Sequence, residues 1–239
     1  MDLHLAMRTT FAAREFVDEP VPDDTLVRIL DAARFAPSGG NRQGWRVIAV
    51  REPKTKDALA ELAVPGMRRY FAQVQAGEFP WNTIAPTKLT REQIEKSPVA
   101  PTLLDRFRRA PLLLVVCLDL SVVASIDSEL SRVGVISGAS IYPFCWNILL
   151  AARAEGLGGV ITTFATAQEP GVKKLLGIPE NFAVAAVMPL GRPVRQLTKL
   201  KRKPVREFAF HERFGGPPLG KEADNSRPTR SEAKSSEGR

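Results

Sequence analysis

Cysteine and histidine are scarce in this chain of 239 residues, which has two of each. Cys117 and Cys145 stand among apolar neighbours, a setting typical of buried thiols rather than of a disulfide or a catalytic nucleophile. His4 and His211 lie near opposite ends, with no cysteine or carboxylate at metal-ligand spacing. The sequence therefore predicts neither a disulfide framework nor a metal site.

Long hydrophobic runs are also missing. The longest, residues 111–118, falls far short of the roughly 20 residues that a membrane-spanning helix needs. The first ten residues contain no basic stretch followed by an apolar one, so no secretory signal is predicted. We therefore expect a soluble, cytoplasmic protein.

Aromatic residues make up only 7% of the chain, whereas hydrophobic residues as a whole make up 44%. The core must then consist largely of Ala, Val, Leu and Ile, which favours an α/β or α+β enzyme-like body over an all-β one. The length suits one main domain, which we place at residues 1–220. Residues 221–239 contain no large apolar side chain, so this tail is predicted to be disordered.

The formal net charge is +8, which fits a nucleic-acid partner, an anionic membrane surface or a phosphorylated cofactor. The basic residues are spread along the chain and cluster tightly only at residues 106–109 and 199–203. A long nucleic-acid-binding stripe is therefore not favoured, and no nucleic-acid recognition motif is present.

Hydrophobic periodicity and turn residues predict an alternation of helices and strands. Residues 133–155 are expected to form the longest helix, apolar on nearly every side and hence covered by the core or by a second subunit. Residues 65–101 contain five prolines and are interpreted either as a lid with short helices over a pocket or as a packed helical insertion. The other predicted helices are 3–13, 23–36, 55–63 and 169–176, and the predicted strands are 45–50, 111–120, 159–164 and 182–190.

Two glycine-containing segments invite a functional reading. Residues 156–159 (Gly-Leu-Gly-Gly) lead from a helix into a strand, the reverse of a dinucleotide-binding fingerprint, so they are interpreted as a helix cap and a tight turn. Residues 37–45 gather a hydroxyl, two carboxamides and several backbone amides beside a flexible turn. This donor and acceptor set suits a polar heterocycle such as a flavin, although a plain loop could carry the same residues.

Several motifs in a fixed order resemble the flavin nitroreductase superfamily, over residues 5–214. The resemblance rests on the following segments: Arg14 and Phe16; Pro37, Ser38, Asn41, Gln43 and Trp45; 147–158; 176–179 (Leu-Gly-Ile-Pro); 189–193 (Pro-Leu-Gly-Arg-Pro); and 201–204 (Lys-Arg-Lys-Pro).

This resemblance implies an α+β fold with a central mixed sheet flanked by helices, an intertwined homodimer and one FMN at each subunit interface. It implies that Arg14 and Arg202, with Lys203, hold the FMN phosphate and ribityl chain. The turn containing Pro37, Ser38, Asn41 and Gln43 would meet the flavin from one subunit or the other. Ile161, Thr162 and Thr163 would run along the ring, with Thr162 or Thr163 near its N5 atom. The Thr-Thr pair is closer to the dehalogenase-like branch of the superfamily.

One segment departs from the family pattern. Family members commonly read Arg-Arg-Ser-x-Arg before the aromatic residue, whereas this chain reads Thr10-Phe11-Ala12-Ala13-Arg14. Two cations and a hydroxyl that could meet the phosphate are missing. Either Arg8 and the C-terminal basic cluster compensate, or FMN binds weakly.

The implied activity is hydride transfer from NADH or NADPH through FMN to a small electron-poor acceptor, by a ping-pong mechanism with no catalytic acid or base from the protein. Nitroaromatics, quinones, enones and halogenated aromatics are all open as acceptors. Alternatives are reductive dehalogenation, a flavin-binding protein for storage or flavin cleavage, and a cofactor-free structural protein. The acceptor is expected to stack on rings of the lid, namely Tyr70, Phe71, Phe79 and Trp81.

Overall fold

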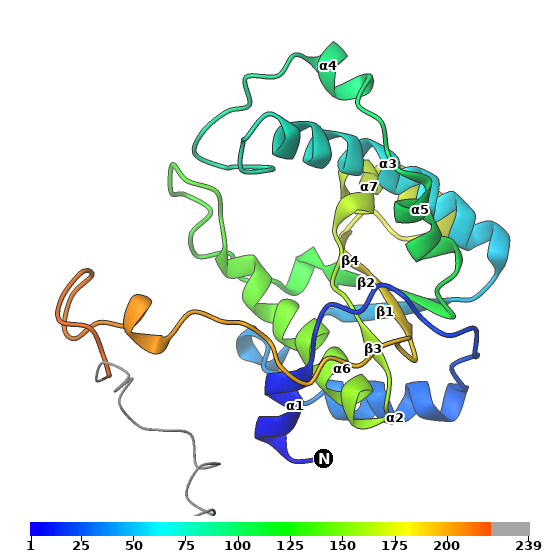
Figure 1. Ribbon diagram of the computed structural model, residues 1–239, viewed down its shortest axis with the longest axis horizontal. Helices are drawn as coiled ribbons and strands as arrows, with labels where there is room; N and C mark the ends of the chain where they lie inside the picture. The colour runs from blue at the N-terminus through cyan, green and yellow to red at the C-terminus, as the bar shows by residue number, and fades with distance from the viewer. Residues whose placement is uncertain (221–239) are drawn as a thin grey trace, which may run out of the picture. The chain divides into compact units, whose positions relative to one another are not determined.

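The computed structural model describes residues 1–220 and divides them into two compact units. Met1–Lys199 form the first unit, and the second begins at Leu200. The predicted disordered tail, residues 221–239, lies outside the described residues. All the α-helices and strands that follow belong to the first unit, and of the 3-10 turns only η5 lies in the second (Figure 1).

A four-stranded antiparallel sheet forms the centre of the first unit, in the order β1-β2-β4-β3. Seven consecutive residues of β2, 112–118, are buried. A strand buried on both faces needs a layer on each side, so the predicted α+β class is confirmed. The mixed character that the resemblance implies is limited to one isolated parallel bridge, between Ala12 and Gly159. The strands are β1 (Trp45–Val50), β2 (Leu112–Asp119), β3 (Gly158–Gly159) and β4 (Phe182–Gly191).

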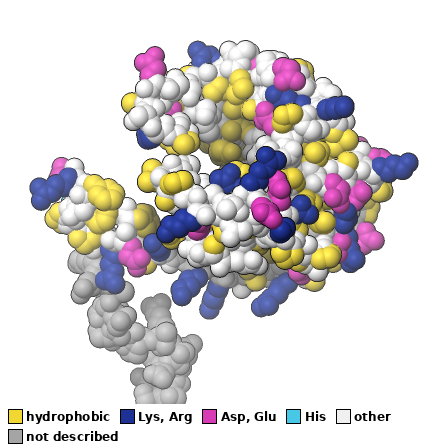
Figure 2. Space-filling model, turned by 90° about the horizontal axis from the view of Figure 1, so that it is seen from above, with side chains coloured by type: hydrophobic (Ala, Val, Ile, Leu, Met, Phe, Trp, Pro, Cys, Tyr) yellow, Lys and Arg dark blue, Asp and Glu magenta, His cyan; other side chains and the backbone are white. Residues whose placement is uncertain are grey.

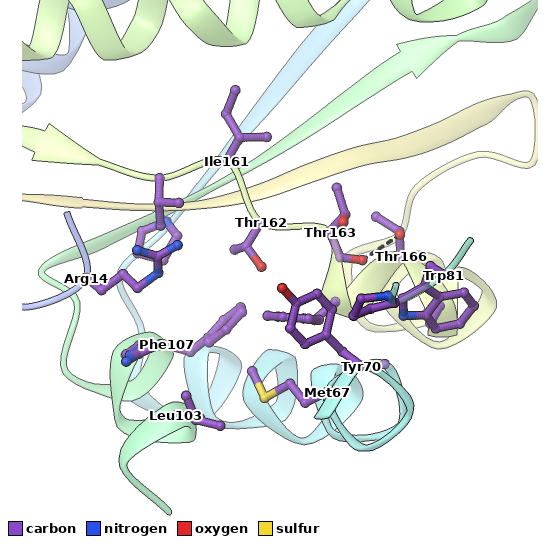
Figure 3. Close-up of a pocket in the computed structure, with 17 residues that line it drawn as sticks. Arg14, Met67, Tyr70, Trp81, Leu103, Phe107, Ile161, Thr162, Thr163 and Thr166 are labelled. Atoms are coloured by element: carbon purple, nitrogen blue, oxygen red, sulfur yellow. Dashed lines mark hydrogen bonds between the residues drawn. The ribbon is translucent and has the colours of Figure 1, made fainter. Parts of the chain in front are cut away.

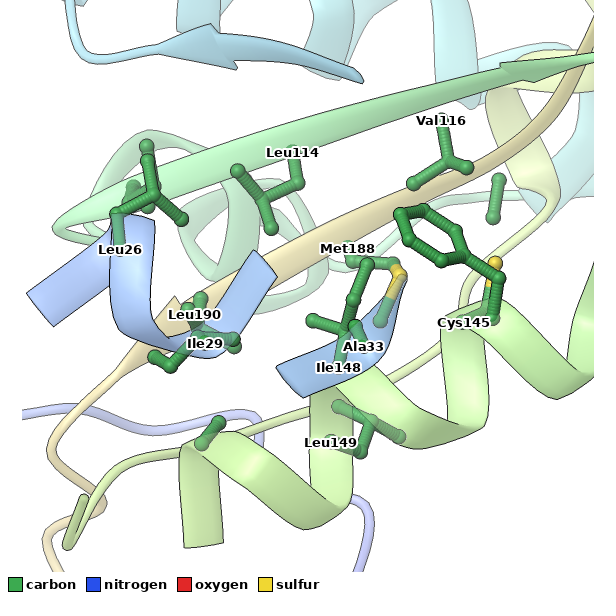
Figure 4. Close-up of a cluster of buried hydrophobic side chains, with 14 of the residues drawn as sticks. Leu26, Ile29, Ala33, Leu114, Val116, Cys145, Ile148, Leu149, Met188 and Leu190 are labelled. Carbon is green, nitrogen blue, oxygen red and sulfur yellow. The ribbon is translucent and has the colours of Figure 1, made fainter. Parts of the chain in front are cut away.

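Helices cover both faces of this sheet, and alternate β2 residues point into two separate cores. Leu114 and Val116 pack against α2 and α6 (Figure 4), whereas Leu113 and Val115 pack on the other side, against α3, α5 and α7. The α-helices are α1 (Leu3–Thr9), α2 (Asp23–Ala33), α3 (Pro53–Gln75), α4 (Arg91–Glu95), α5 (Pro101–Arg108), α6 (Tyr142–Ala154) and α7 (Glu169–Leu176). The 3-10 turns are η1 (Gly39–Asn41), η2 (Leu120–Val122), η3 (Ile136–Ser140), η4 (Phe164–Gln168) and η5 (Val205–Glu207).

Helix α3 is far longer than the predicted segment 55–63, because it continues through Pro65 to Gln75. An internal proline removes one hydrogen bond and crowds the carbonyl four residues earlier. Pro65 and Glu61 both lie on the exposed side of the helix, where water can reach the carbonyl that loses its partner. Ala63 and Met67, on the opposite side, are fully or almost fully buried. Tertiary packing of this buried side therefore outweighs the local helix-breaking signal.

Helix α6 is shorter than the predicted 133–155, since it begins only at Tyr142. The buried carboxylate of Asp127 accepts hydrogen bonds from the backbone N–H of Val135 (2.8 Å) and from Arg132 (2.6 Å). These bonds hold the preceding residues in a loop instead of a helix. Within a single chain, Tyr142 and Trp146 of α6 are 43% and 38% exposed. The prediction of a helix covered on every side therefore does not hold for one chain alone.

The described part of the second unit, residues 200–220, folds locally upon itself. Phe210 pairs with Pro218 in an isolated antiparallel bridge, and the Phe210 and Phe214 ring centroids are 5.9 Å apart. Phe208 and Phe214 are 62% and 100% exposed.

On the face drawn in Figure 2, basic and acidic side chains are interspersed among apolar ones. Within residues 1–220, no helix has the length and hydropathy needed to cross a bilayer.

Candidate functional site

A cavity of about 650 Å³ lies in the first unit, beside α3, α5 and the segment between β3 and η4. Figure 3 shows Arg14 at one end, Trp81 at the other, and Thr162 and Tyr70 between them. The lining residues used below are Arg14, Tyr70, Trp81, Arg106, Ile161, Thr162 and Thr163. The cavity thus combines cations, hydroxyls and aromatic rings.

Thr162 presents a buried hydroxyl that lacks a hydrogen-bond partner among the described residues. Its backbone N–H donates to the carbonyl of Val187 (3.2 Å), and its own carbonyl accepts from the N–H of Val187 (2.9 Å). The backbone is therefore committed to β4, and only the side chain is available to a ligand. An unsatisfied buried hydroxyl costs about 1–3 kcal/mol, which a ligand with a polar edge would relieve.

The loop that carries Thr162 approaches the sheet closely because it follows two glycines. A Cβ atom on Gly159 would lie 2.5 Å from the carbonyl oxygen of Pro189, so a larger residue does not fit there. The carbonyl of Gly159 accepts the N–H of Ala13 (3.0 Å), which fixes the segment that carries Arg14 beside the same loop. The predicted cap is also present, since Gly156 adopts a φ of 77° after α6. The predicted strand 159–164 is reduced to β3 and the bridge at Thr162.

Arg14 and Arg106 bring two guanidinium groups to the cavity without a carboxylate partner among the described residues. Arg14 donates only to the carbonyl of Ala12 (3.1 Å). The pKa of Arg14 is lowered, first by burial and then by the positive charge of Arg106, with Tyr70 opposing the shift. Arg14 stays protonated, since a guanidinium is not deprotonated in proteins. The pair is thus arranged to receive an anion.

In the sequence, Arg106 is distinguished only as part of a basic cluster. Its neighbour Arg108 pairs instead with Asp57 (2.5 Å) and Glu61 (2.6 Å) of α3. Arg106 and Arg108 point in different directions because they are two positions apart on one helix. Of the residues expected to compensate for the missing phosphate ligands, Arg8 does not line the cavity. The Thr10 hydroxyl donates to the carbonyl of Ala6 (2.8 Å) and so serves α1.

The aromatic residues predicted to meet the acceptor separate into two groups. Tyr70 and Trp81 line the cavity, as Figure 3 shows. Phe71 packs instead against the core on the α3 side of the sheet, edge-on to Tyr70 with ring centroids 5.2 Å apart. Phe79 is 81% exposed and does not line the cavity. The helix spacing explains Phe71, because adjacent residues of α3 cannot face the same side.

The turn containing Pro37, Ser38, Asn41 and Gln43 does not line this cavity. Asn41 and Gln43 adopt left-handed backbone angles, with φ of 52° and 49°. The hydroxyl of Ser38 accepts the N–H of Gln43 (3.0 Å), and the N–H of Gly39 donates to the hydroxyl of Ser140 (3.1 Å). The turn is therefore rigidly shaped and lies beside η3. Arg202 and Lys203 belong to the second unit and are exposed.

The donor set of the cavity fits FMN. A flavin ring is planar, with polar atoms along its edge, and the whole molecule is anionic. The unpaired hydroxyl of Thr162 matches a polar ring edge, and the paired cations Arg14 and Arg106 match negative charge. Residues 1–220 contain no group of three His, Cys, Asp or Glu side chains that could hold a metal ion.

Comparisons with known proteins agree with this α+β fold. The model of the Nitroreductase family matches residues 6–192, and the chain belongs to that family. It is a flavin-dependent oxidoreductase of the nitroreductase type.

The individual relatives are named for different activities. The NADH dehydrogenase of Thermus thermophilus is 29% identical over 210 residues, which cover 88% of this chain and 96% of that protein. The nitrobenzene nitroreductase of Ectopseudomonas oleovorans is 27% identical and covers 77% of this chain and 84% of that protein. A crystal structure of oxidized iodotyrosine deiodinase bound to FMN and 3-iodo-L-tyrosine superposes with a TM-score of 0.60. It is 25% identical and covers 84% of this chain and 95% of that one.

Proposed function

We propose that this protein binds FMN in the described cavity and passes hydride from NADH or NADPH to a small, electron-poor acceptor. The observation that carries the proposal is the buried, unpartnered Thr162 hydroxyl between two cations and two aromatic rings in one cavity. When bound, FMN supplies the capacity to take up and release a hydride. The protein then has to bind, orient and exclude water, which needs no acid/base pair of its own.

Each part of the cavity has a separate task in this proposal. Arg14 and Arg106 hold negative charge of the cofactor at one end. Ile161 gives an apolar surface to the ring, and Thr162 offers its hydroxyl near N5, since its backbone groups are bonded to Val187. Tyr70 and Trp81 line the space for the nicotinamide and the acceptor. These two molecules occupy the space one after the other, which produces ping-pong kinetics. Arg202 and Lys203 stay a prediction from the family resemblance, as cations for the FMN phosphate.

The turn containing Pro37, Ser38, Asn41 and Gln43 completes the site from a second copy of the chain. Two observations support this proposal. The turn does not line the cavity of its own chain, and its Gly39 is bonded to Ser140, which lies between 120–136 and α6 in the chain. These two segments expose several large apolar side chains, each at least 38% exposed, namely Ile126, Leu130, Val133, Val135, Tyr142 and Trp146. Exposed apolar side chains gathered in this way are typical of a protein interface, and a second copy supplies both the cover and the turn.

Reductive dehalogenation of a halogenated aromatic is the second candidate. The Thr162-Thr163 pair and the similarity to the deiodinase structure favour it. Both candidates share the cofactor and the reductant and differ only in the acceptor.

Absorbance of the purified protein tests the proposal. After incubation with FMN and removal of the excess, we expect a yellow protein that bleaches on anaerobic addition of NADH or NADPH. Nitrobenzene, a quinone or 3-iodotyrosine is then added in parallel to find which one restores the oxidised spectrum. A protein that binds FMN but is never bleached would favour storage or flavin cleavage. A protein that stays colourless would contradict the proposal altogether.

A further inference from the structure

The segment that follows α3 is anchored by two side chains, Gln73 and Glu78. Gln73 is 1% exposed, and both ends of its carboxamide are bonded. Its oxygen accepts the backbone N–H of Trp81 (3.0 Å), and its nitrogen donates to Glu78 Oε2 (3.1 Å). Glu78 accepts in addition the hydroxyl of Thr87 (2.6 Å) and the N–H of Lys88 (2.8 Å). One buried amide and one carboxylate therefore tie residues 78–88 to the helix.

Trp81 is held by this anchor in an unfavourable conformation. Its φ of 54° lies in the left-handed region, which bulky residues avoid. The guanidinium of Arg69 lies 4.0 Å from the centre of its indole ring and covers one face of it. Trp81 also lines the cavity. A strained, non-glycine residue persists where its surroundings determine its position, and such residues cluster at ligand sites.

We propose that Trp81 determines acceptor specificity by stacking against a planar aromatic acceptor, and that Gln73 and Glu78 are positioning residues for it. This proposal rests on the proposed oxidoreductase function. Trp81 occupies the end of the cavity away from Arg14, and Tyr70 lies between the two, as Figure 3 shows, so an aromatic ring near that end finds stacking partners. The anchor fixes the indole before a ligand arrives, which reduces the entropy lost on binding.

Trp81→Gly tests the ring itself, because glycine suits the left-handed backbone and removes only the side chain. The assay measures kcat and KM with NADH, using nitrobenzene as the aromatic acceptor and ferricyanide as the non-aromatic one. We expect the ratio of kcat/KM values, nitrobenzene over ferricyanide, to fall by about tenfold, mainly through KM. Trp81→Phe should restore most of the ratio. Phe79→Ala is the matched control, because Phe79 is 81% exposed and lies outside the cavity.

Glu78→Ala and Glu78→Gln test the anchor without touching the ring. The alanine variant should lower the same ratio, and the glutamine variant, which keeps two polar groups, should lower it less. If the ratio is unaltered in Trp81→Gly, or if Phe79→Ala lowers it as much, the specificity assignment is wrong. If Glu78→Ala retains the ratio while Trp81→Gly loses it, the positioning role is wrong. Loss of FMN from Trp81→Gly would instead make Trp81 a cofactor ligand. A wild-type protein that binds no FMN would overturn the proposed function before any of these comparisons.

Discussion

At the scale of single residues, the cavity is defined by groups whose partners are missing. The positive charges of Arg14 and Arg106 repel each other, and the buried hydroxyl of Thr162 has no hydrogen-bond partner among the described residues. Each of these arrangements costs free energy in the isolated chain and becomes favourable when an anionic, polar-edged ligand is bound. They therefore indicate where a ligand belongs more directly than the volume of the cavity does.

The exchange of Arg106 for alanine tests this electrostatic argument. We expect Arg106→Ala to weaken FMN binding by about 1.5–3 kcal/mol, the range for a hydrogen bond to a charged group, or about tenfold to a hundredfold in Kd. Fluorescence titration of the apoprotein with FMN gives the constant. Arg109→Ala is the control, since Arg109 is 82% exposed and pairs loosely with Asp105 (3.6 Å). If Arg202→Ala alone weakens binding, the charge is held from the second unit.

The thiols of the two cysteines should be unreactive in the folded protein. Burial raises the pKa of Cys117 to about 11 and that of Cys145 to about 12, because an apolar environment disfavours the thiolate. At pH 8 a disulfide reagent that detects released thiolate should therefore react with neither thiol in native protein. Both should react once the chain is unfolded in guanidinium. Rapid labelling of the native state would show that one of them is accessible and ionised.

Part of the site could be predicted from sequence, and the exceptions have physical causes. Arg14, Thr162, Thr163, Tyr70 and Trp81 do line the cavity. Arg106 could not be singled out, because only the start of α5 decides which arginine of a basic run points inward. The turn at Ser38 does not line the cavity of its own chain, and its contact with a flavin stays a prediction, because sequence does not tell whether a segment serves its own chain or a second copy.

At the scale of elements, three of the four strands were predictable, whereas β3 and the ends of α3 and α6 were not. β1, β2, β4 and α7 match their predictions within about two residues, because burial on one or both faces leaves a clear hydrophobic pattern. Helix α3 was cut short in the prediction at Pro65, and α6 was extended through a loop that Asp127 holds. The first error comes from packing of α3 against distant residues and the second from side-chain bonds to Asp127, and a pattern of hydrophobic residues contains neither.

Helix α3 depends on one close backbone contact with the active-site loop. A Cβ atom on Gly66 would collide with the carbonyl oxygen of Phe164. Since that neighbour is backbone, Gly66→Ala should destabilise the protein by about 1–3 kcal/mol. The melting temperature should fall by about 2–4 °C for each kcal/mol. Gly39→Ala is the control in a thermal melt, because its Cβ would meet only the Ser140 hydroxyl at 3.5 Å. Equal melting temperatures for both variants would mean that α3 and η4 can separate without loss.

At the scale of the whole molecule, one chain leaves an apolar face and a shaped turn without a function of their own. Trp146 on α6 is 38% exposed, and Val135, in the segment before α6, is 64% exposed. If a second copy covers this face, Trp146→Glu should produce a monomer in sedimentation and lose FMN at the same time. Leu175→Glu is the matched control, because Leu175 is also 38% exposed but lies on α7, across the sheet. A monomer that keeps its FMN would contradict the shared site.

Subunit mixing can decide whether the turn acts on its own chain or on the partner. One differently tagged chain carries Arg106→Ala, which damages the cavity, and the other carries Asn41→Ala with Gln43→Ala, which damages the turn. Each homodimer should bind FMN weakly. If each site is built from the cavity of one chain and the turn of the other, the mixed dimer contains one site in which both parts are intact. One of the two sites is then whole, so the expected content is about one FMN per dimer at the wild-type Kd, because a site needs only one good copy of each part. If the turn serves its own chain, both sites keep a defect, and mixing restores nothing.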